Sequence, residues 1–120
     1  MAQKKILVVD DAEFNRDLVI QLLGDEYEML VAVDGEEAVR KTEEEKPDLI
    51  LMDLGMPVMD GWEATRRIKA NSELKHIPII AVTSHAMVGD EIQVREAGCD
   101  DYIPKPIDEN ELIRKIKKFI

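Results

Sequence analysis

Residues 48–61 read DLILMDLGMPVMDG, and the first half of this stretch decides the fold. Residues 49–52 are apolar without a break, and Asp53 follows them at once. A short apolar run without alternation is typical of a strand that is buried on both faces, as the strands of a parallel sheet are. The stretch therefore predicts a strand of a parallel sheet that ends on a carboxylate.

The rest of the chain repeats this pattern in alternation with amphipathic stretches. Four further strands are predicted at residues 6–9, 28–33, 77–82 and 101–103. Helical spacing of apolar residues, or an aspartate suited to cap a helix, marks a helix after each strand. The markers of the five helices are, in chain order, Phe14, Leu18 and Leu22, with Val19 and Leu23 widening the stripe; Asp34 and Glu37; Trp62, Thr65 and Ile68; Val88, Ile92 and the terminating Gly98; and Asp108, Leu112, Ile113, Ile116 and Ile120. This alternation predicts a flavodoxin-like (βα)5 three-layer α/β sandwich, with a parallel sheet of order 2-1-3-4-5 in one domain over residues 1–120.

Composition argues against several classes of function. The 120 residues include 26 Asp and Glu against 16 Lys and Arg, which gives a formal net charge of −10. Nucleic-acid binding and docking on an anionic membrane both need a basic face, so we expect neither. The single cysteine, Cys99, has no partner for an internal disulfide, and no apolar run is long enough for a signal peptide or a membrane span. We therefore expect a cytoplasmic protein in which Cys99 is a packing residue.

Polar residues stand where the predicted strands end. They are Asp10 and Asp11 after the first strand, Asp53 after the third, Thr83 after the fourth, and Lys105 just past the fifth. Because the carboxyl ends of parallel strands share one edge of the sheet, these groups should converge there. One aspartate after a strand is usually a turn or cap residue. Three carboxylates, a hydroxyl and an ammonium group at one edge indicate a functional site instead.

The chemistry of this set favours phosphoryl transfer with a magnesium ion. Clustered carboxylates repel each other, so they need a cation if all of them are to stay ionised. Mg²⁺ prefers oxygen ligands, whereas softer metals prefer the histidine and cysteine side chains that the cluster lacks. Asp53 can then attack phosphorus as a nucleophile. Lys105, the Thr83 hydroxyl and the ion can neutralise the phosphoryl oxygens.

Four segments of the sequence resemble one known family along the whole chain. ILVVDD at 6–11, DLILMDLGMPVMDG at 48–61, IIAVTS at 79–84 and YIPKP at 102–106 fall in the order and at the intervals of the receiver domains of two-component response regulators. The segment DDAEFNRDL at 10–18 is similar to the first-helix signature of receivers in hybrid kinases and of stand-alone relay regulators, including the cell-polarity regulator class.

The resemblance implies a role for each matching residue. Asp53 would be the phosphorylated aspartate. The groups that hold Mg²⁺ would be Asp10, Asp11 (the more direct of the two), Asp53 and the Gly55 carbonyl. Thr83 and Lys105 would bind the phosphoryl group, and Lys105–Pro106 would be a cis peptide.

The resemblance also implies partners and an output. The donor would be a histidine kinase or a histidine phosphotransfer protein, and the chain would not be an enzyme beyond its own phosphorylation and dephosphorylation. Tyr102 occupies the switch-aromatic position of the family. We expect Thr83 to move toward the phosphoryl group and Tyr102 to follow. This would change the face made by the fourth helix, the fifth strand and the fifth helix, which a protein effector reads. Gly55 and His85 flank the approach of water to phosphorus, so we expect them to set the lifetime of the phosphorylated form.

Three other functions compete with this interpretation. A flavodoxin would carry a Ser-, Thr- or Gly-rich phosphate loop after the first strand, where this chain has Asp10 and Asp11. A dehalogenase-type phosphatase needs a second aspartate two residues after its nucleophile, where this chain has Gly55. A degenerate receiver that serves only as an interaction module would lack Asp53, Asp11 or Lys105, and all three are present.

Overall fold

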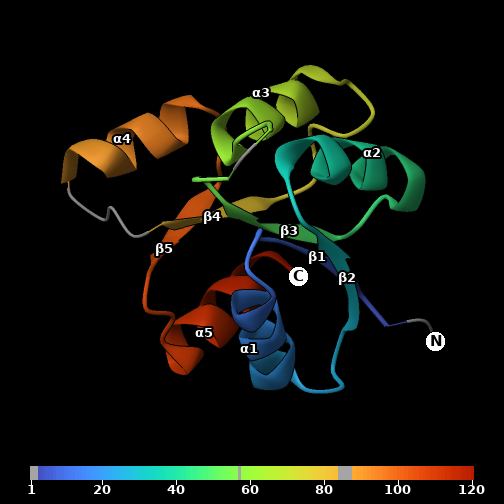
Figure 1. Cartoon of the computed structure of the whole chain (residues 1–120), viewed down its shortest axis with the longest axis vertical. Helices are drawn as coiled ribbons and strands as arrows, with labels where there is room; N and C mark the ends of the chain where they lie inside the picture. The colour runs from blue at the N-terminus through green and yellow to red at the C-terminus, as the bar shows by residue number, and fades with distance from the viewer. Residues whose placement is uncertain (1–2, 57, 84–87) are drawn as a thin grey trace.

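The computed structural model describes residues 3–56, 58–83 and 88–120, in which strands and helices alternate (Figure 1). The strands are β1 (Lys5–Val9), β2 (Glu28–Ala32), β3 (Leu49–Asp53), β4 (Ile79–Thr83) and β5 (Asp101–Pro104). The helices are α1 (Glu13–Leu23), α2 (Gly35–Glu45), α3 (Gly61–Ala70), α4 (Val88–Glu96) and α5 (Glu109–Phe119). The candidate residue His85 lies outside the described residues.

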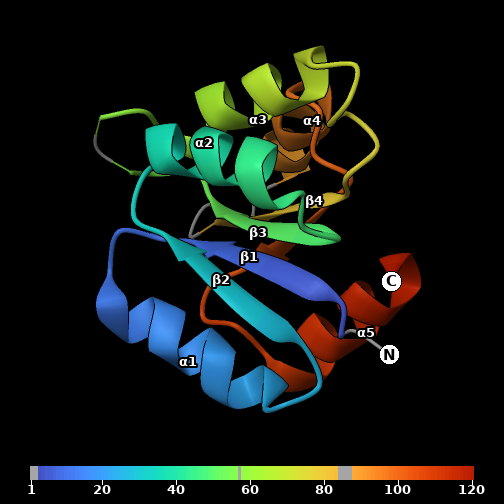
Figure 2. The ribbon, with the colours of Figure 1, turned by 90° about the vertical axis from the view of Figure 1, so that its right-hand side faces the viewer.

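The strands form one parallel sheet of order β2-β1-β3-β4-β5. α1 and α5 cover one face of this sheet, and α2, α3 and α4 cover the other (Figures 1 and 2). Val9 pairs with Met52, so the ends of β1 and β3, which carry Asp10 and Asp53, lie side by side. The predicted three-layer fold and its strand order are confirmed.

The uninterrupted apolar runs are explained by a core on each side of the sheet. Leu7 and Ile50 belong to the cluster on the side of α2, α3 and α4, whereas Ile6 and Leu51 belong to the cluster on the side of α1 and α5. Neighbouring residues of a strand point to opposite faces, so both must be apolar when both faces are covered. Each such side chain contributes roughly 1.5–3 kcal/mol of burial free energy.

Strand boundaries differ slightly from those predicted. The run at 77–82 predicted a strand that starts at Ile77, but β4 starts at Ile79 and extends to Thr83. Pro78 has no N–H to donate, and its carbonyl accepts a hydrogen bond from the Ile50 N–H at 2.9 Å just before the strand. Ile77 is nevertheless buried.

Two helices bury only part of the apolar stripe that the sequence predicts. Phe14 on α1 is 77% exposed, and the buried residues of that helix are Val19 and Leu23. Ile92 on α4 is 57% exposed, whereas Val94 is buried. Side chains that are two positions apart on a helix differ in direction by about 200°. Ile92 and Val94 therefore point in nearly opposite directions.

The first turns of three helices are capped by aspartates. Asp34 accepts a hydrogen bond from the Glu37 N–H at 2.8 Å, Asp60 from the Glu63 N–H at 2.9 Å, and Asp108 from the Asn110 N–H at 3.0 Å. Each bond satisfies an N–H that has no partner within its own helix. The caps predicted at Asp34 and Asp108 are therefore confirmed.

Cys99 is buried, and this burial raises the pKa of its thiol to about 11. The thiol therefore stays protonated at neutral pH and fills space beside Thr65, as predicted for a packing residue. Across the described ranges, no helix has both the length and the apolar character needed to cross a membrane.

Candidate functional site

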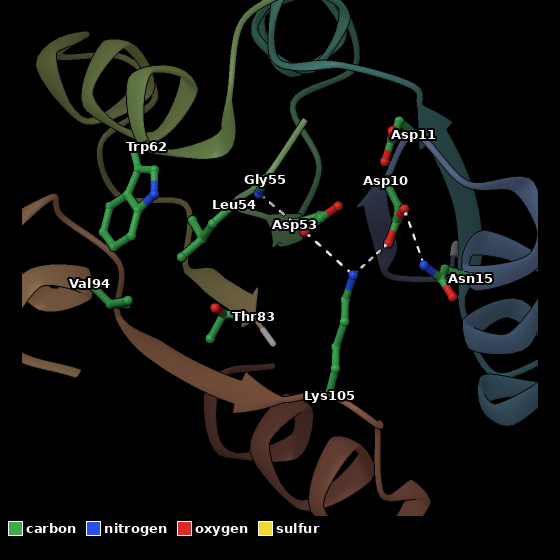
Figure 3. A pocket seen from close by; sticks show the side chains of 10 residues that line it. All are labelled: Asp10, Asp11, Asn15, Asp53, Leu54, Gly55, Trp62, Thr83, Val94 and Lys105. Atoms are coloured by element: carbon green, nitrogen blue, oxygen red, sulfur yellow. Dashed lines mark hydrogen bonds and ion pairs between the residues drawn. The ribbon is translucent and has the colours of Figure 1, made fainter. Parts of the chain in front are cut away.

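A cavity of about 320 Å³ opens at the carboxyl edge of the sheet (Figure 3). Loops and strand ends of β1, β3, β4 and β5 supply most of its wall, and the first turn of α1 closes one side. The residues that line it are Asp10, Asp11, Asn15, Asp53, Leu54, Gly55, Trp62, Thr83, Val94 and Lys105. The polar groups that the sequence placed at strand ends thus do converge.

Three carboxylates lie together in this cavity. One oxygen each from Asp10, Asp11 and Asp53 falls within 4.8 Å of the others. Asp10 and Asp53 are buried, and Asp11 is exposed at the mouth. All the candidate ligand atoms are oxygens, and this is the donor set that Mg²⁺ selects.

Lys105 reaches between two of these carboxylates. Its Nζ lies 3.4 Å from Asp10 Oδ2 and 3.5 Å from Asp53 Oδ1 (Figure 3). Its backbone N–H donates to the Thr83 carbonyl at 2.8 Å, which fixes the start of the loop after β5 against the end of β4. The peptide bond to Pro106 is cis, as the family resemblance implied.

The electrostatic balance of the cavity leaves negative charge in excess. Burial raises the pKa of Asp53, and the charge of Asp10 raises it further. Lys105 and the Gly55 N–H, 3.3 Å from Asp53 Oδ1, lower this pKa but do not reverse the shift. A divalent cation at the three carboxylates would supply the missing positive charge.

The two neighbouring aspartates differ in how freely they can bind an ion. Asp10 Oδ1 accepts from the Ala12 N–H at 2.9 Å and from Asn15 Nδ2 at 3.5 Å, and Oδ2 pairs with Lys105. The Asp11 carboxylate makes no hydrogen bond or ion pair with any other described residue. Of the two carboxylates, Asp11 is therefore the one that is more available to bind an ion.

The first residue of α3, Gly61, packs closely against the backbone of Asp53 and Leu54. The Gly61 N–H donates to the Leu54 carbonyl at 3.1 Å. A Cβ at Gly61 would lie 2.2 Å from the Asp53 carbonyl oxygen and 2.8 Å from Leu54 Cα. Only glycine allows α3 to approach the peptide of the acceptor this closely.

The remaining predicted residues fall into three groups. Thr83 is buried at the end of β4 and lines the cavity, and Gly55 lines it from an exposed position. Tyr102 lies on β5, one strand beyond Thr83, and packs against the core on the side of α2, α3 and α4 without lining the cavity. His85 lies outside the described residues.

The wall also contains four residues outside the predicted site, which are Asn15, Leu54, Trp62 and Val94. Asn15 stands within the segment DDAEFNRDL, only five positions after Asp10. Its amide is directed at the Asp10 carboxylate (Figure 3). Trp62, which the sequence indicated only as a marker of its helix, both packs against the core and forms part of the cavity wall.

Comparison with known proteins adds the following. The sequence model described as "Response regulator receiver domain" matches residues 6–117. The polar-differentiation response regulator DivK of Brucella anthropi is 42% identical over 118 residues, which are 98% of this chain and 96% of that protein. The receiver domain of a sensor histidine kinase from Pseudomonas aeruginosa, solved with magnesium coordinated in its active site cleft, is 38% identical with a TM-score of 0.90 and 98% of each chain covered. The chemotaxis response regulator CheY4 of Vibrio cholerae is 29% identical with a TM-score of 0.92, covering 99% of this chain and all of that one.

Proposed function

The chain belongs to the family of response regulator receiver domains, and from this premise we propose that residues 1–120 form one receiver domain that is phosphorylated on Asp53 in a Mg²⁺-dependent reaction. One observation carries the proposal. The Asp53 carboxylate ends the central strand, with the Lys105 ammonium group 3.5 Å away and two further carboxylates within 4.8 Å. The domain acts as a switch and turns over no substrate beyond its own phosphoryl group.

Asp11, Asp53 and the Gly55 carbonyl would hold Mg²⁺ directly. Asp10 would hold the ion less directly, because both of its carboxylate oxygens already accept hydrogen bonds from protein donors. When bound, the ion supplies positive charge to the phosphoryl oxygens and to the cluster of carboxylates. The magnesium ion in the Pseudomonas aeruginosa receiver supports this assignment.

In the reaction, an Asp53 carboxylate oxygen attacks the phosphorus of a phosphohistidine. The new O–P bond forms as the N–P bond breaks, and the electron pair of the broken bond stays on the imidazole nitrogen of the donor. Lys105 leaves its contact with Asp53 and pairs with a phosphoryl oxygen, while the Thr83 hydroxyl donates to another. Hydrolysis by water reverses the modification, and substitution of Gly55 or His85 is expected to change the rate of this step.

The donor, a histidine kinase or a histidine phosphotransfer protein of the cytoplasm, approaches from the side of α1. An apolar groove of about 410 Å³ runs beside the cavity and shares Asn15 and Lys105 with it. Phe14 forms its exposed rim, and Leu18 and Ile107 are part of its wall. A donor helix that covers this groove would bring its histidine to the mouth above Asp53.

The signal leaves through the face made by α4, β5 and α5. Thr83 ends β4, and Tyr102 lies on the adjacent strand, paired with Ala81. A shift of the Thr83 hydroxyl toward the phosphoryl group changes the space available to Tyr102 on that face. The phosphoryl group can move this equilibrium only through contacts that differ between the two states, and Thr83 provides such a contact. A protein effector then reads the altered face.

Phosphorylation by acetyl phosphate tests the proposal. Incubation with acetyl phosphate and Mg²⁺ should add one phosphoryl group that is labile to base and hydroxylamine. Asp53→Asn should abolish the reaction, whereas Asp60→Asn, at an exposed helix cap, should react like the wild type. Equal labelling of Asp53→Asn and the wild type would refute the assignment of the acceptor.

A further inference from the structure

Lys115 of α5 reaches round the edge of the sheet to a residue on the other face. β5 is an edge strand, α5 covers one face, and the Tyr102 side chain packs on the opposite face. Even so, Lys115 Nζ lies 4.9 Å from the centroid of the Tyr102 ring, and it donates a hydrogen bond to the Tyr102 carbonyl. Lys115 therefore covers both the ring and the open backbone edge of this residue.

A buried carboxylate next to Tyr102 holds Lys115 in this place. Asp101 Oδ1 is 3.3 Å from Lys115 Nζ and accepts from the Tyr102 N–H at 2.8 Å. Burial alone would raise the pKa of Asp101, but the Tyr102 N–H, Lys115 and Lys118 more than offset this effect and hold the pKa below its ordinary value. Asp101 is thus ionised at neutral pH and anchors the ammonium group of Lys115.

The same carboxylate joins α4 to α5. Arg95 of α4 approaches Asp101 Oδ1 at 3.7 Å, and Lys118 approaches Oδ2 at 3.6 Å. Of the two α5 lysines that pair with Asp101, Lys115 also contacts the Tyr102 ring and Lys118 does not, and the Lys115 side chain is 17% exposed against 64% for Lys118. The two lysines thus share a carboxylate but differ in their contact with the aromatic ring.

We propose that Lys115 is a positioning residue for Tyr102, which holds the ring in the arrangement of the unphosphorylated chain and so opposes activation. The inference rests on the switch role proposed for Tyr102. A ring that moves away on phosphorylation must give up its contact with the ammonium group. The contact therefore stabilises one state only, and it adds to the free-energy gap that the phosphoryl group has to overcome.

Lys115→Met and Lys118→Met form a matched pair for the test. Each removes one cation from Asp101 and keeps an apolar stem, but only Lys115→Met removes the contact with Tyr102. Lys115→Gln is a second variant that keeps a hydrogen-bond donor for the Tyr102 carbonyl and lacks the charge. The full chain labelled with ¹³C-tyrosine gives ring signals from Tyr102 and Tyr27, and Tyr27, which precedes β2, serves as an internal reference.

The first measurement uses the protein without a phosphoryl mimic. The Tyr102 ring signals should shift in both Lys115 variants and stay in place in Lys118→Met, with Tyr27 unchanged in all. The second is a titration with beryllofluoride at saturating Mg²⁺. Loss of one partly buried cation–π contact should make beryllofluoride bind roughly three- to tenfold more tightly to the Lys115 variants, and Lys118→Met should stay within about twofold of the wild type.

The inference would be overturned if the Tyr102 ring signals had the same chemical shifts in the Lys115 and Lys118 variants. Beryllofluoride affinity that is equal or weaker in the Lys115 variants would overturn it too, because the contact would then persist in, or belong to, the activated state. A wild-type chain that does not bind beryllofluoride would refute the proposed function instead. In that case the first measurement would still decide whether Lys115 positions the ring.

Discussion

Removal of the acceptor carboxylate should stabilise the chain when Mg²⁺ is absent. The three carboxylates have oxygens within 4.8 Å of one another, and with an effective dielectric constant of about 20 the repulsion of two unit charges at that limit costs about 3.5 kcal/mol. The attraction between Asp53 and Lys105 at 3.5 Å contributes about 4.7 kcal/mol. Asp53 faces two such carboxylates and one ammonium group, and the exposed Asp11 is partly screened. Ionised Asp53 therefore destabilises the fold, and Asp53→Asn should raise the free energy of unfolding by about 1–2 kcal/mol, or the melting temperature by roughly 4–8 °C.

Magnesium should make the wild type more stable than Asp53→Asn. Wild type gains RT ln(1 + [Mg²⁺]/Kd), which is about 2.7 kcal/mol at a hundred times Kd. Asp53→Asn has lost a ligand and should gain less. Thermal melts in chelator and in a magnesium series, with Asp60→Asn as the control, measure both effects. A Mg²⁺-free Asp53→Asn that melts below the wild type, or equal gains on adding Mg²⁺, would refute the reasoning.

Without Mg²⁺, the difference in the free energy of unfolding between Asp53→Asn and the wild type should change with pH in one direction. The pKa of Asp53 is raised in the folded state, so the unfolded chain loses this proton first as the pH rises. Below the ordinary pKa of aspartate both states are protonated, and the two proteins should differ little. Above it the wild type should lose stability relative to Asp53→Asn until the pH passes the folded-state pKa, after which the difference should stay constant.

Three further outcomes are expected. Val58 is 80% exposed and has a φ of +68°, which is strained for a β-branched residue, so Val58→Gly should raise the free energy of unfolding by about 1 kcal/mol in denaturant titrations; a loss of stability would contradict this. Gly61→Ala should slow phosphorylation by acetyl phosphate as well as destabilise the fold by about 2 kcal/mol or more, because the new Cβ would meet the Asp53 carbonyl at 2.2 Å. Gly35→Ala, which would clash with the Met59 carbonyl, should destabilise the fold without this kinetic effect, and equal rates for the two variants would argue against the reasoning. His85→Ala should change the rate of dephosphorylation while phosphorylation persists, and identical decay rates would exclude a role for His85 in the lifetime.

The sheet and the convergence of the site could be predicted because both follow from local patterns. Residues 6–9 and 49–52 are apolar at every position, as a strand that is covered on both faces needs to be. Once the strands are parallel, Asp10 and Asp53 must share an edge, whatever the details of packing. Burial, pairing distances and the excess negative charge around Asp53 are properties of three-dimensional contacts that no single segment specifies.

Helix orientation and the outer parts of the site could not be predicted in this way. Periodicity defines an apolar stripe, but Phe14 and Ile92 lie beyond the part of each stripe that meets the sheet. Asn15 joins the site because the first turn of α1 lies over the end of β1, and its sequence position alone does not show this. The contact of Lys115 with Tyr102 depends on a side chain that passes round the edge of the sheet, across thirteen positions of sequence.

Trp62 is the sole tryptophan of the chain, and it stands in the wall of the cavity that contains Asp53. Its indole therefore gives the unlabelled protein an intrinsic optical reporter next to the proposed acceptor carboxylate. Fluorescence excited at wavelengths that tyrosine does not absorb comes from this one ring. A change in its intensity when an ion or phosphoryl group binds would therefore be measured without background from other fluorophores. Rapid-mixing traces of intrinsic fluorescence can thus test for the proposed ion binding, phosphoryl transfer and decay in one sample, with no dye attached near the proposed partner surfaces.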